Sequence, residues 1–226
     1  MIPTLTFEEA RVFGALIEKS QATPAYYPMS LNALRNACNQ ITGRDPVTNF
    51  DEDTVETALE GLRTKGLVAY ASGVGRVLKY MHRAGRNGLE LTPAEAAVVS
   101  VLLLRGPQTA GEIRVRTASQ FRFENPALVE ETIKGLMAET RGIVEEAPRK
   151  AGQKETRYRH RFFVYPPGNA DHAETGHPTA RGSSEADHRD LRSIVAELQK
   201  ENAVLRARVD ELERIVAELA SRLQAG

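Results

Sequence analysis

The sequence predicts a mainly α-helical α+β fold made of two copies of one unit, followed by a C-terminal coiled coil. A helical segment with the skeleton V-E-x-x-[LI]-x-G-L occurs at residues 51–68 and again at residues 125–144. The motif L-T-x-x-E-A precedes each copy, and a basic strand of the form [KR]-Y-x-H-R follows each. Because three landmarks recur in the same order at a near-constant offset, we interpret residues 1–88 and 89–166 as two domains of one type.

Composition and charge exclude several classes of protein. The 226 residues carry 30 basic and 30 acidic side chains, so the net charge indicates no particular partner. The single cysteine, Cys38, excludes an internal disulfide and a cysteine-rich zinc site. The first ten residues lack a secretion signal, and the longest apolar stretch, 96–104, is too short to span a bilayer. We therefore expect a cytoplasmic protein.

The first domain is expected to contain three helices and then a hairpin. Thr6 and Glu9 form a capping box at the start of the first helix, and Ser30 caps the second. Gly66 ends the third helix, because glycine tolerates a left-handed C-cap. The predicted elements are helices over residues 6–19, 30–39 and 51–65, a polar connection over 39–50, and a hairpin over 67–83.

The second domain is expected to repeat this order. Thr92, Pro93 and Glu95 begin its first helix, and Thr109 and Glu112 form a capping box for a short second helix. Its third helix begins at 125–126 and its hairpin covers 143–163. Helix, helix, helix and hairpin is the order of a winged helix, in which a helix-turn-helix precedes a two-stranded wing. The sequence thus predicts two tandem winged-helix domains, with wing one at 67–83 and wing two at 143–163.

Two glycines lie inside the repeated third helices. Gly61 and Gly135 occupy the same position of the skeleton, where glycine costs about 1 kcal/mol relative to alanine. We expect the first helix of each domain to approach these glycines closely.

A leucine zipper is predicted at the C-terminus. Residues 167–186 are rich in Pro, Gly, Ser, Thr and His and are expected to be a flexible linker before a coiled coil over 187–226. β-Branched residues at a with leucine at d favour a parallel dimer, and Asn202 at an a position fixes its register. The predicted dimerisation residues are Leu191, Val195, Leu198, Asn202, Leu205, Val209, Leu212, Val216 and Leu219.

A family resemblance adds to this interpretation. The run Y-P-M-S-L-N-A-L-x-N-A-C-N-Q at 27–40, with R-D-P-V at 44–47 and Asn49, resembles the YceH-type family of bacterial proteins of unassigned function. The segments at 102–116 and 157–162 are also similar. The resemblance covers residues 4–163 and implies a tandem winged-helix fold. It supplies no activity, ligand or catalytic residue.

The third helices are acidic, which argues against ordinary recognition-helix binding to DNA. Residues 51–65 hold five acidic side chains and only two basic ones, and Glu130, Glu131 and Glu139 outnumber Lys134 in the second copy. Carboxylates near phosphates are repelled, and phosphate contacts dominate affinity for DNA.

The wings, in contrast, are basic. Strand alternation places Arg157, Arg159 and Arg161 on one face and Tyr158 and His160 on the other. Phosphate binding and protection of an edge strand by charge both remain open for wing one, whereas phosphate binding is favoured for wing two. The candidate nucleic-acid-binding residues are Arg149, Lys150, Lys154, Arg157, Arg159 and Arg161 in wing two and Arg76, Lys79 and Arg83 in wing one.

Other polar residues are assigned structural roles. Asn32, Asn36 and Asn39 could contact base edges, but we favour hydrogen bonding to the connection at 39–50. Cys38 is expected in the core, and His172 and His177 lack the carboxylates of a metal site.

No catalytic motif, phosphate loop or metal-binding motif occurs, so we expect a protein that is not an enzyme and has no cofactor. The predicted function is sequence-tolerant binding of duplex DNA through the wings by a homodimer, as in a transcriptional regulator. The alternative is a protein-docking scaffold that uses its winged helices and coiled coil.

Overall fold

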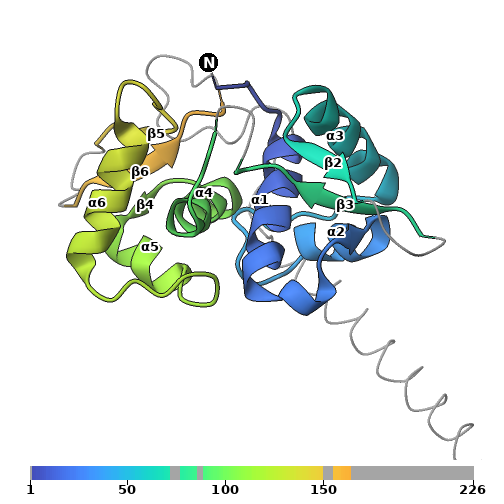
Figure 1. The fold of residues 1–226 in the computed structure, drawn as a ribbon, viewed down its shortest axis with the longest axis horizontal. Helices are drawn as coiled ribbons and strands as arrows, with labels where there is room; N and C mark the ends of the chain where they lie inside the picture. Colours follow the sequence, from blue (N-terminus) through green and yellow to red (C-terminus); the bar gives the residue numbers. More distant parts are fainter. Residues whose placement is uncertain (1, 72–76, 86–88, 150–154, 164–226) are drawn as a thin grey trace, which may run out of the picture. The chain divides into compact units, whose positions relative to one another are not determined.

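The computed structural model describes residues 2–71, 77–85, 89–149 and 155–163 (Figure 1). These residues form an α+β fold in which one set of elements occurs twice. The first repeat contains α1 (Phe7–Ala22), the 3-10 helix η1 (Pro24–Tyr26), β1 (Met29–Ser30), α2 (Leu31–Cys38), α3 (Glu52–Thr64), β2 (Val68–Tyr70) and β3 (Lys79–His82). The second repeat contains α4 (Pro93–Arg105), β4 (Gln108–Thr109), α5 (Ala110–Arg116), α6 (Pro126–Met137), β5 (Val144–Glu146) and β6 (Arg157–His160). The order of helices and hairpins predicted for each repeat is confirmed.

The predicted N-termini of the helices are also confirmed, but the first helix continues to Ala22, beyond its predicted end at residue 19. In each predicted capping box the threonine hydroxyl accepts the N–H of the glutamate, and the glutamate carboxylate accepts the N–H of the threonine. The pairs are Thr6 with Glu9, Thr92 with Glu95, and Thr109 with Glu112. Gly66 adopts a left-handed φ angle of 72° directly after the C-cap of α3, as a glycine C-cap requires. Gly142 is also left-handed, with φ at 54°, but α6 ends at Met137 with Ala138 as its C-cap, so this glycine does not end the helix.

Each sheet has a third strand that the sequence did not indicate. The strand orders are β1-β3-β2 and β4-β6-β5, and all neighbours are antiparallel. β1 pairs Met29 with Tyr80, and β4 pairs Gln108 with Tyr158. Both strands are two residues long, so they are too short to produce an alternating pattern in the sequence. They attach each hairpin to the start of the second helix of its repeat.

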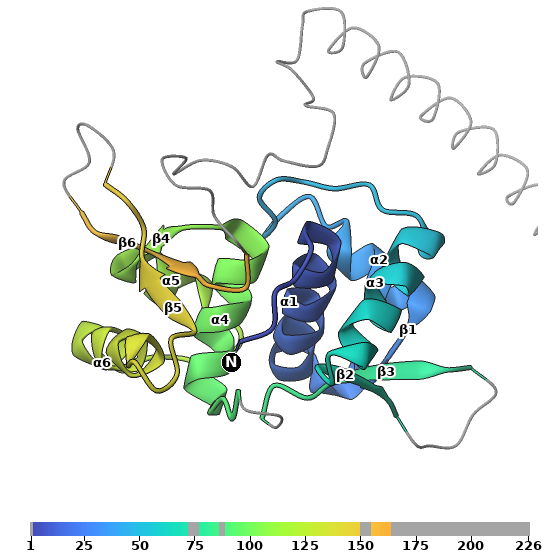
Figure 2. The ribbon, with the colours of Figure 1, turned by 90° about the horizontal axis from the view of Figure 1, so that it is seen from above.

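The two repeats pack against each other through their first helices, which lie side by side in Figures 1 and 2. Residues 9–17 of α1 and 95–104 of α4 are all buried, as expected for helices covered on every side. Gly14 lies where they cross: a side chain there would come within 3.0 Å of Leu103 Cβ and of Leu104 Cγ. Both repeats therefore belong to one compact unit.

Further contacts join the repeats at both ends of the interface. The Leu5 N–H donates to the Phe162 carbonyl (2.8 Å), and the Phe13 and Phe162 rings meet edge to face with centroids 6.3 Å apart. The Asp45 N–H donates to the Leu104 carbonyl near the C-terminus of α4 (2.9 Å). The N-terminal segment is thus fixed to the end of the second repeat.

The glycines inside the third helices both face the first helix of their repeat, but at different distances. A side chain at Gly61 would collide with the Glu9 carboxylate, which is buried and ion-paired with Lys65. Gly135 faces Glu95, which is ion-paired with Arg141, but a side chain there would lie at an ordinary 3.9 Å. The predicted close approach is confirmed at Gly61, whereas at Gly135 it is wrong because that glycine is exposed.

Candidate nucleic-acid interface

The candidate interface consists of two hairpins, the first at residues 67–83 and the second at 143–163, each anchored by an inward-facing tyrosine and histidine. Tyr80 and His160 are buried, and His82 and Tyr158 are half-buried. β2 pairs Val68 with His82, and β5 pairs Val144 with His160, so the register is the same in both hairpins. The inward direction predicted for Tyr158 and His160 is confirmed.

The His82 side chain is held in its neutral form by its contacts. Its Nδ1 accepts the Ala84 N–H (3.2 Å), and its Nε2 lies 2.8 Å from the Ser20 hydroxyl. Burial lowers the pKa of His82 from 6.5 to about 4. Burial, together with the charge of Arg159, lowers the pKa of His160 to about 3. Both anchors are therefore uncharged near neutral pH and contribute no positive charge to the hairpins.

The outward face of the first hairpin is apolar and cationic. Val77, Leu78 and Met81 are 66%, 51% and 36% exposed, and Lys79 and Arg83 are exposed beside them. No acidic residue occurs anywhere in 67–83. In the described part of the chain neither Lys79 nor Arg83 has an ion-pair partner. Their charges are consequently available to an anionic partner.

The outward face of the second hairpin is charged, and its arginines are paired within the repeat. Arg157 donates to Glu112 (2.9 Å) and to the Pro107 carbonyl (2.9 Å). Arg159 donates to Glu145 at 2.7 Å, and Arg161 lies 3.3 Å from the same carboxylate. The predicted row of three arginines therefore exists, but two carboxylates already neutralise much of its charge.

The remaining predicted residues of the interface are divided between the surface and the undescribed part of the chain. Arg149 is exposed near the tip of the second hairpin and donates to the Thr156 hydroxyl (3.0 Å). Arg76, Lys150 and Lys154 lie outside the described residues, as do the linker over 167–186 and every predicted dimerisation residue from Leu191 to Leu219.

The acidic side chains of the third helices lie at the surface. Glu56 and Glu60 are exposed on α3, and Glu60 is engaged by Arg63 and by the Tyr70 hydroxyl (3.1 Å). On α6, Glu130 and Glu131 are exposed. The faces that a recognition helix would present to DNA thus carry negative charge in both repeats.

Of the three asparagines on α2 and its C-cap, only Asn39 forms the predicted hydrogen bonds to the connection at 39–50. Its carboxamide donates to the Phe50 carbonyl and accepts the Phe50 N–H, both at 2.8 Å, so it closes the connection between α2 and α3. Asn36 donates to Asn32 (3.3 Å), and Asn32 donates to Glu52 (3.3 Å) on the exposed side of α2. Those two amides do not bind the connection.

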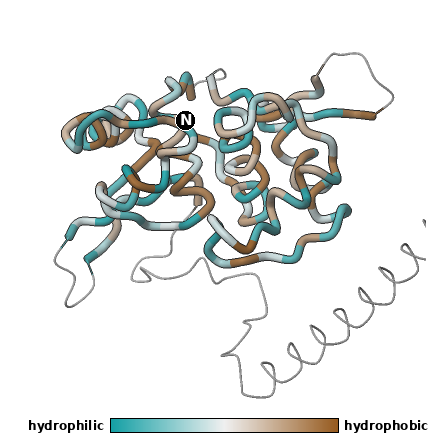
Figure 3. Tube along the Cα trace, turned by 90° about the horizontal axis from the view of Figure 1, so that it is seen from below, coloured by the Kyte–Doolittle hydropathy of each residue, from teal (hydrophilic) through white to brown (hydrophobic). Residues whose placement is uncertain are grey.

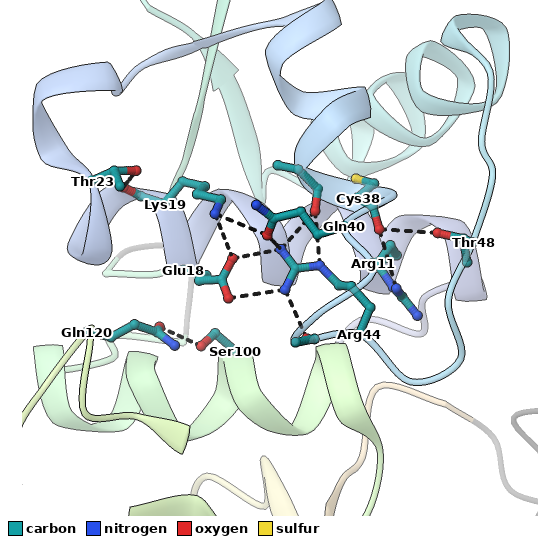
Figure 4. Close-up of polar contacts among 12 residues, drawn as sticks. Arg11, Glu18, Lys19, Thr23, Cys38, Gln40, Arg44, Thr48, Ser100 and Gln120 are labelled. Atoms are coloured by element: carbon teal, nitrogen blue, oxygen red, sulfur yellow. Dashed lines mark hydrogen bonds and ion pairs between the residues drawn. The ribbon is translucent and has the colours of Figure 1, made fainter. Parts of the chain in front are cut away.

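Two buried arginines hold the same connection, and the sequence did not indicate either of them (Figure 4). Arg44 forms two hydrogen bonds with the Glu18 carboxylate, at 3.1 and 2.7 Å, and also donates to the Ala37 carbonyl. Burial alone would raise the pKa of Glu18, but the hydrogen bonds and charge of Arg44 outweigh it and lower that pKa. This ion pair fixes the connection to α1.

The second arginine, Arg11, is fully buried in α1. It donates to the carbonyl oxygens of Pro46 (2.7 Å) and Cys38 (3.4 Å), and its guanidinium lies over the Phe7 ring at 5.3 Å. Burial and then the charge of Arg44 lower its pKa to about 10. The partners of Arg11 are distant in sequence, so no local pattern indicates that it is buried. The only sign of its burial is that α1 is covered on every side.

The described residues contain no group of three or more His, Cys, Asp or Glu side chains that could hold a metal ion. Cys38 is buried as predicted, and burial raises the pKa of its thiol to about 12. None of the helices in the described ranges is long and apolar enough to cross a membrane.

The comparisons with known proteins place the chain in a family. The fold and site define an α+β protein made of two like repeats, each with an exposed hairpin of different surface chemistry. The family model described as "Protein of unknown function, DUF480" matches residues 5–153, and the chain belongs to this family. The resemblance to an uncharacterised bacterial family inferred from the sequence is therefore confirmed.

Curated relatives extend the similarity beyond the family model. A UPF0502 protein of Shewanella sp. (strain W3-18-1) is 42% identical over 92% of this chain and 97% of its own length. One from Solibacter usitatus (strain Ellin6076) is 46% identical over 91% and 95% of the two chains. One from Geotalea daltonii (strain DSM 22248 / JCM 15807 / FRC-32) is 48% identical over 72% and 74%. The first two matches cover so much of the chain that they extend past residue 163.

Proposed function

We propose that each repeat is a winged-helix domain and that the protein binds duplex DNA through its two hairpins, in the manner of a cytoplasmic transcriptional regulator without enzymatic activity. The observation that carries the proposal is the charge of the first hairpin. Lys79 and Arg83 are exposed there, residues 67–83 contain no acid, and the described residues offer these two cations no carboxylate. Cations available on a projecting hairpin are suited to phosphate contacts.

The second hairpin contributes positive charge of a different kind. Three arginines share the carboxylates of Glu112 and Glu145, so the arginines outnumber the carboxylates that pair with them. Arg149 and the basic residues Lys150 and Lys154 of its tip add to this charge. A phosphate approaching the strands would compete with the two carboxylates, so we expect the tip to contribute more than the strands.

The third helices are expected to stay out of the major groove. Exposed Glu56 and Glu60 on α3 and Glu130 and Glu131 on α6 would face phosphates there and be repelled. Binding led by the hairpins and directed to phosphates is salt-sensitive and only weakly selective.

A homodimer is part of the proposal. The heptads over 188–223 favour a parallel coiled coil, which would present two pairs of hairpins to one duplex and add avidity. Truncation after Pro167 should give a monomer by light scattering. A full-length protein that is monomeric at micromolar concentration would contradict the dimer.

The DNA proposal is tested by fluorescence anisotropy of a labelled duplex at several salt concentrations. We expect Lys79→Ser with Arg83→Ser to weaken binding and to lower the log–log salt slope by about 2, because each removed cation leaves one phosphate without its partner. Arg114→Ser with Arg122→Ser removes the same charge from exposed positions outside the hairpins and serves as the matched control. An equally weakened control would contradict a hairpin-led interface, and no binding by the unaltered protein would contradict DNA binding itself.

The exposed face of α6 favours a second candidate, protein docking. Leu128 is 38% exposed there, next to the exposed carboxylates of Glu130 and Glu131. An apolar residue rimmed by acids suits a basic protein partner better than a nucleic acid. Loss of partner capture in Glu130→Gln with Glu131→Gln, together with no duplex binding at low salt, would favour this function.

A further inference from the structure

The first hairpin carries apolar side chains where the second carries charged and polar ones. The shared Tyr-x-His strand aligns Val77, Leu78 and Met81 with Glu155, Thr156 and Arg159. The inward residues of β3 and β6 are identical, a tyrosine and a histidine, and the cross-strand pair Ala69–Met81 corresponds to Glu145–Arg159. Because the second hairpin forms the same register with polar residues, the strand pairing does not require apolar ones in the first.

The exposed apolar residues of the first hairpin are gathered at its projecting end. β3 extends past α3 toward the edge of the repeat (Figure 2), and the tube is hydrophobic where the hairpin meets the grey trace (Figure 3). Val77 and Leu78, which precede β3 directly, are more than half exposed. Exposed apolar area is unfavourable in water, so this end of the hairpin is suited to contact with a partner.

The charge around these side chains selects an anionic partner. Lys79 follows the apolar end directly, Arg83 follows β3 at the base of the hairpin, and no acid occurs in 67–83. A two-stranded ribbon fits the major groove of B-DNA, which is about 12 Å wide, and not an unopened minor groove of about 6 Å. In the major groove the apolar group that a base presents is the 5-methyl of thymine.

We infer that Val77 and Leu78 contact thymine methyl groups in the major groove while Lys79 and Arg83 bind the flanking phosphates. This inference rests on the proposed function and deepens it, because it gives a hairpin that otherwise binds only phosphates a preference among base pairs. It assigns the preference to apolar contact, since the described end of the hairpin offers a base edge no carboxamide or carboxylate.

The test removes the methyl groups from the DNA. Full-length protein is titrated against an alternating A·T duplex and the same duplex with deoxyuridine in place of thymidine, which keeps every charge and hydrogen bond. We expect the deoxyuridine duplex to bind more weakly, by roughly fourfold for each methyl group that the protein would otherwise cover, since burying one such group contributes about 0.8 kcal/mol. Val77→Ser with Leu78→Ser should bind both duplexes with the same weaker affinity and an unchanged salt slope, because serine offers no methyl group to the thymine methyl.

Controls separate this inference from the function on which it rests. Ile41→Thr alters a residue that is 83% exposed outside the hairpins and should leave the preference for thymine intact. Equal affinity of the unaltered protein for both duplexes would overturn the methyl contact while leaving DNA binding in place. An equal loss of affinity for A·T and G·C duplexes in the hairpin variant would also overturn the methyl contact. That pattern would indicate apolar side chains that contact DNA, or insert between base pairs, without regard to sequence. Binding to no duplex would overturn the proposed function as well.

Discussion

The two repeats share a frame and differ on their surfaces. In both, a buried glutamate of the first helix caps that helix and forms an ion pair with the basic residue that precedes a left-handed glycine: Glu9 with Lys65, and Glu95 with Arg141. In both, a Tyr-x-His strand anchors the hairpin. The outward side of that strand, however, is apolar and cationic in the first repeat, whereas in the second it carries arginines that are paired with carboxylates. The residues that cap the first helix and anchor the hairpin are alike in both copies, and the outward-facing residues of the hairpins differ.

The connection between the second and third helices differs as well. In the first repeat, Asn39 to Phe50 is held by Arg11, Arg44 and Asn39 and reaches α4 through the Asp45 N–H. In the second repeat, residues 117–125 connect α5 to α6 and contain no buried arginine. The first repeat therefore has an ordered connection that contacts the second repeat, and the second repeat has no corresponding connection.

The largest expected effect on stability comes from breaking the ion pair between Arg44 and Glu18, which holds this connection. Arg44→Met should destabilise the protein by about 3 kcal/mol, because it leaves the largely covered Glu18 carboxylate with only the longer ion pair to Lys19 (3.4 Å). Arg35→Met, which removes an exposed ion pair with Glu52, should cost less than about 1 kcal/mol. Urea unfolding followed by circular dichroism measures both. Equal effects of the two changes would show that the connection does not depend on its buried ion pair.

A second prediction concerns the histidines that the repeats share. The folded-state pKa values of His82 and His160 lie below the ordinary 6.5, so the unfolded chain binds more protons below pH 6.5. Stability should fall as pH decreases from about 6.5 toward about 4, by up to ~1.4 kcal/mol per pH unit for each histidine. Unfolding free energies at about pH 7 and about pH 5 test this. His82→Gln should reduce the pH dependence, and an unchanged dependence would exclude that histidine as its source.

The glycines inside α3 and α6 allow the same substitution to be compared in the two repeats. Gly135→Ala should stabilise the protein by up to about 1 kcal/mol, because the glycine is exposed and a methyl group has room there. Gly61→Ala should instead destabilise it by about 1 kcal/mol, since displacing Glu9 disturbs a helix cap. Thermal unfolding of the two variants decides it. If both substitutions stabilised the protein, the Glu9 carboxylate would have to move aside freely.

The smallest effect on stability is expected at the second hairpin. Glu145→Gln removes the carboxylate shared by Arg159 and Arg161 and should cost at most about 1 kcal/mol. It should also increase affinity for duplex DNA, because less negative charge faces the phosphates. Glu146→Gln makes the same charge change at the exposed neighbour and is the control. A greater increase in the control would indicate that the arginines of the strands do not contact DNA.

The sequence predicted what depends on local chemistry. The capping boxes, the C-cap glycine Gly66 and the order of elements follow from residues a few positions apart, and these predictions were correct. The second helix glycine, Gly142, does not end α6, because that helix stops at Met137 before a further turn. The alternation of Tyr158 and His160 with the arginines also follows from local geometry. The identity of the arginines' partners does not, because Glu112 and Arg157 are distant in sequence and meet only through the β4–β6 pairing.

The features that the sequence did not indicate depend on tertiary structure. Arg11 is a charged residue that is fully buried, and its guanidinium donates to the carbonyl oxygens of Cys38 and Pro46, which are distant in sequence. The strands β1 and β4 exist only because a hairpin lies beside them. Residues 96–104 are apolar except for Ser100, and a helix that is apolar on every side is expected to be covered on every side. This run therefore indicated that another element packs on α4, but it did not identify α1 as that element.

The hydrogen bond from Leu5 to Phe162 has a consequence for the order of folding during synthesis. The ribosome releases the N-terminal segment first, yet the carbonyl that binds it directly follows the last strand of the second repeat. Until that strand emerges, α1 lacks the cover that α4 and Phe162 provide, so the nascent first repeat exposes apolar side chains. Contacts of such long sequence separation form slowly, and the newly made first repeat is therefore the stage at which this chain is most exposed to aggregation and to chaperones.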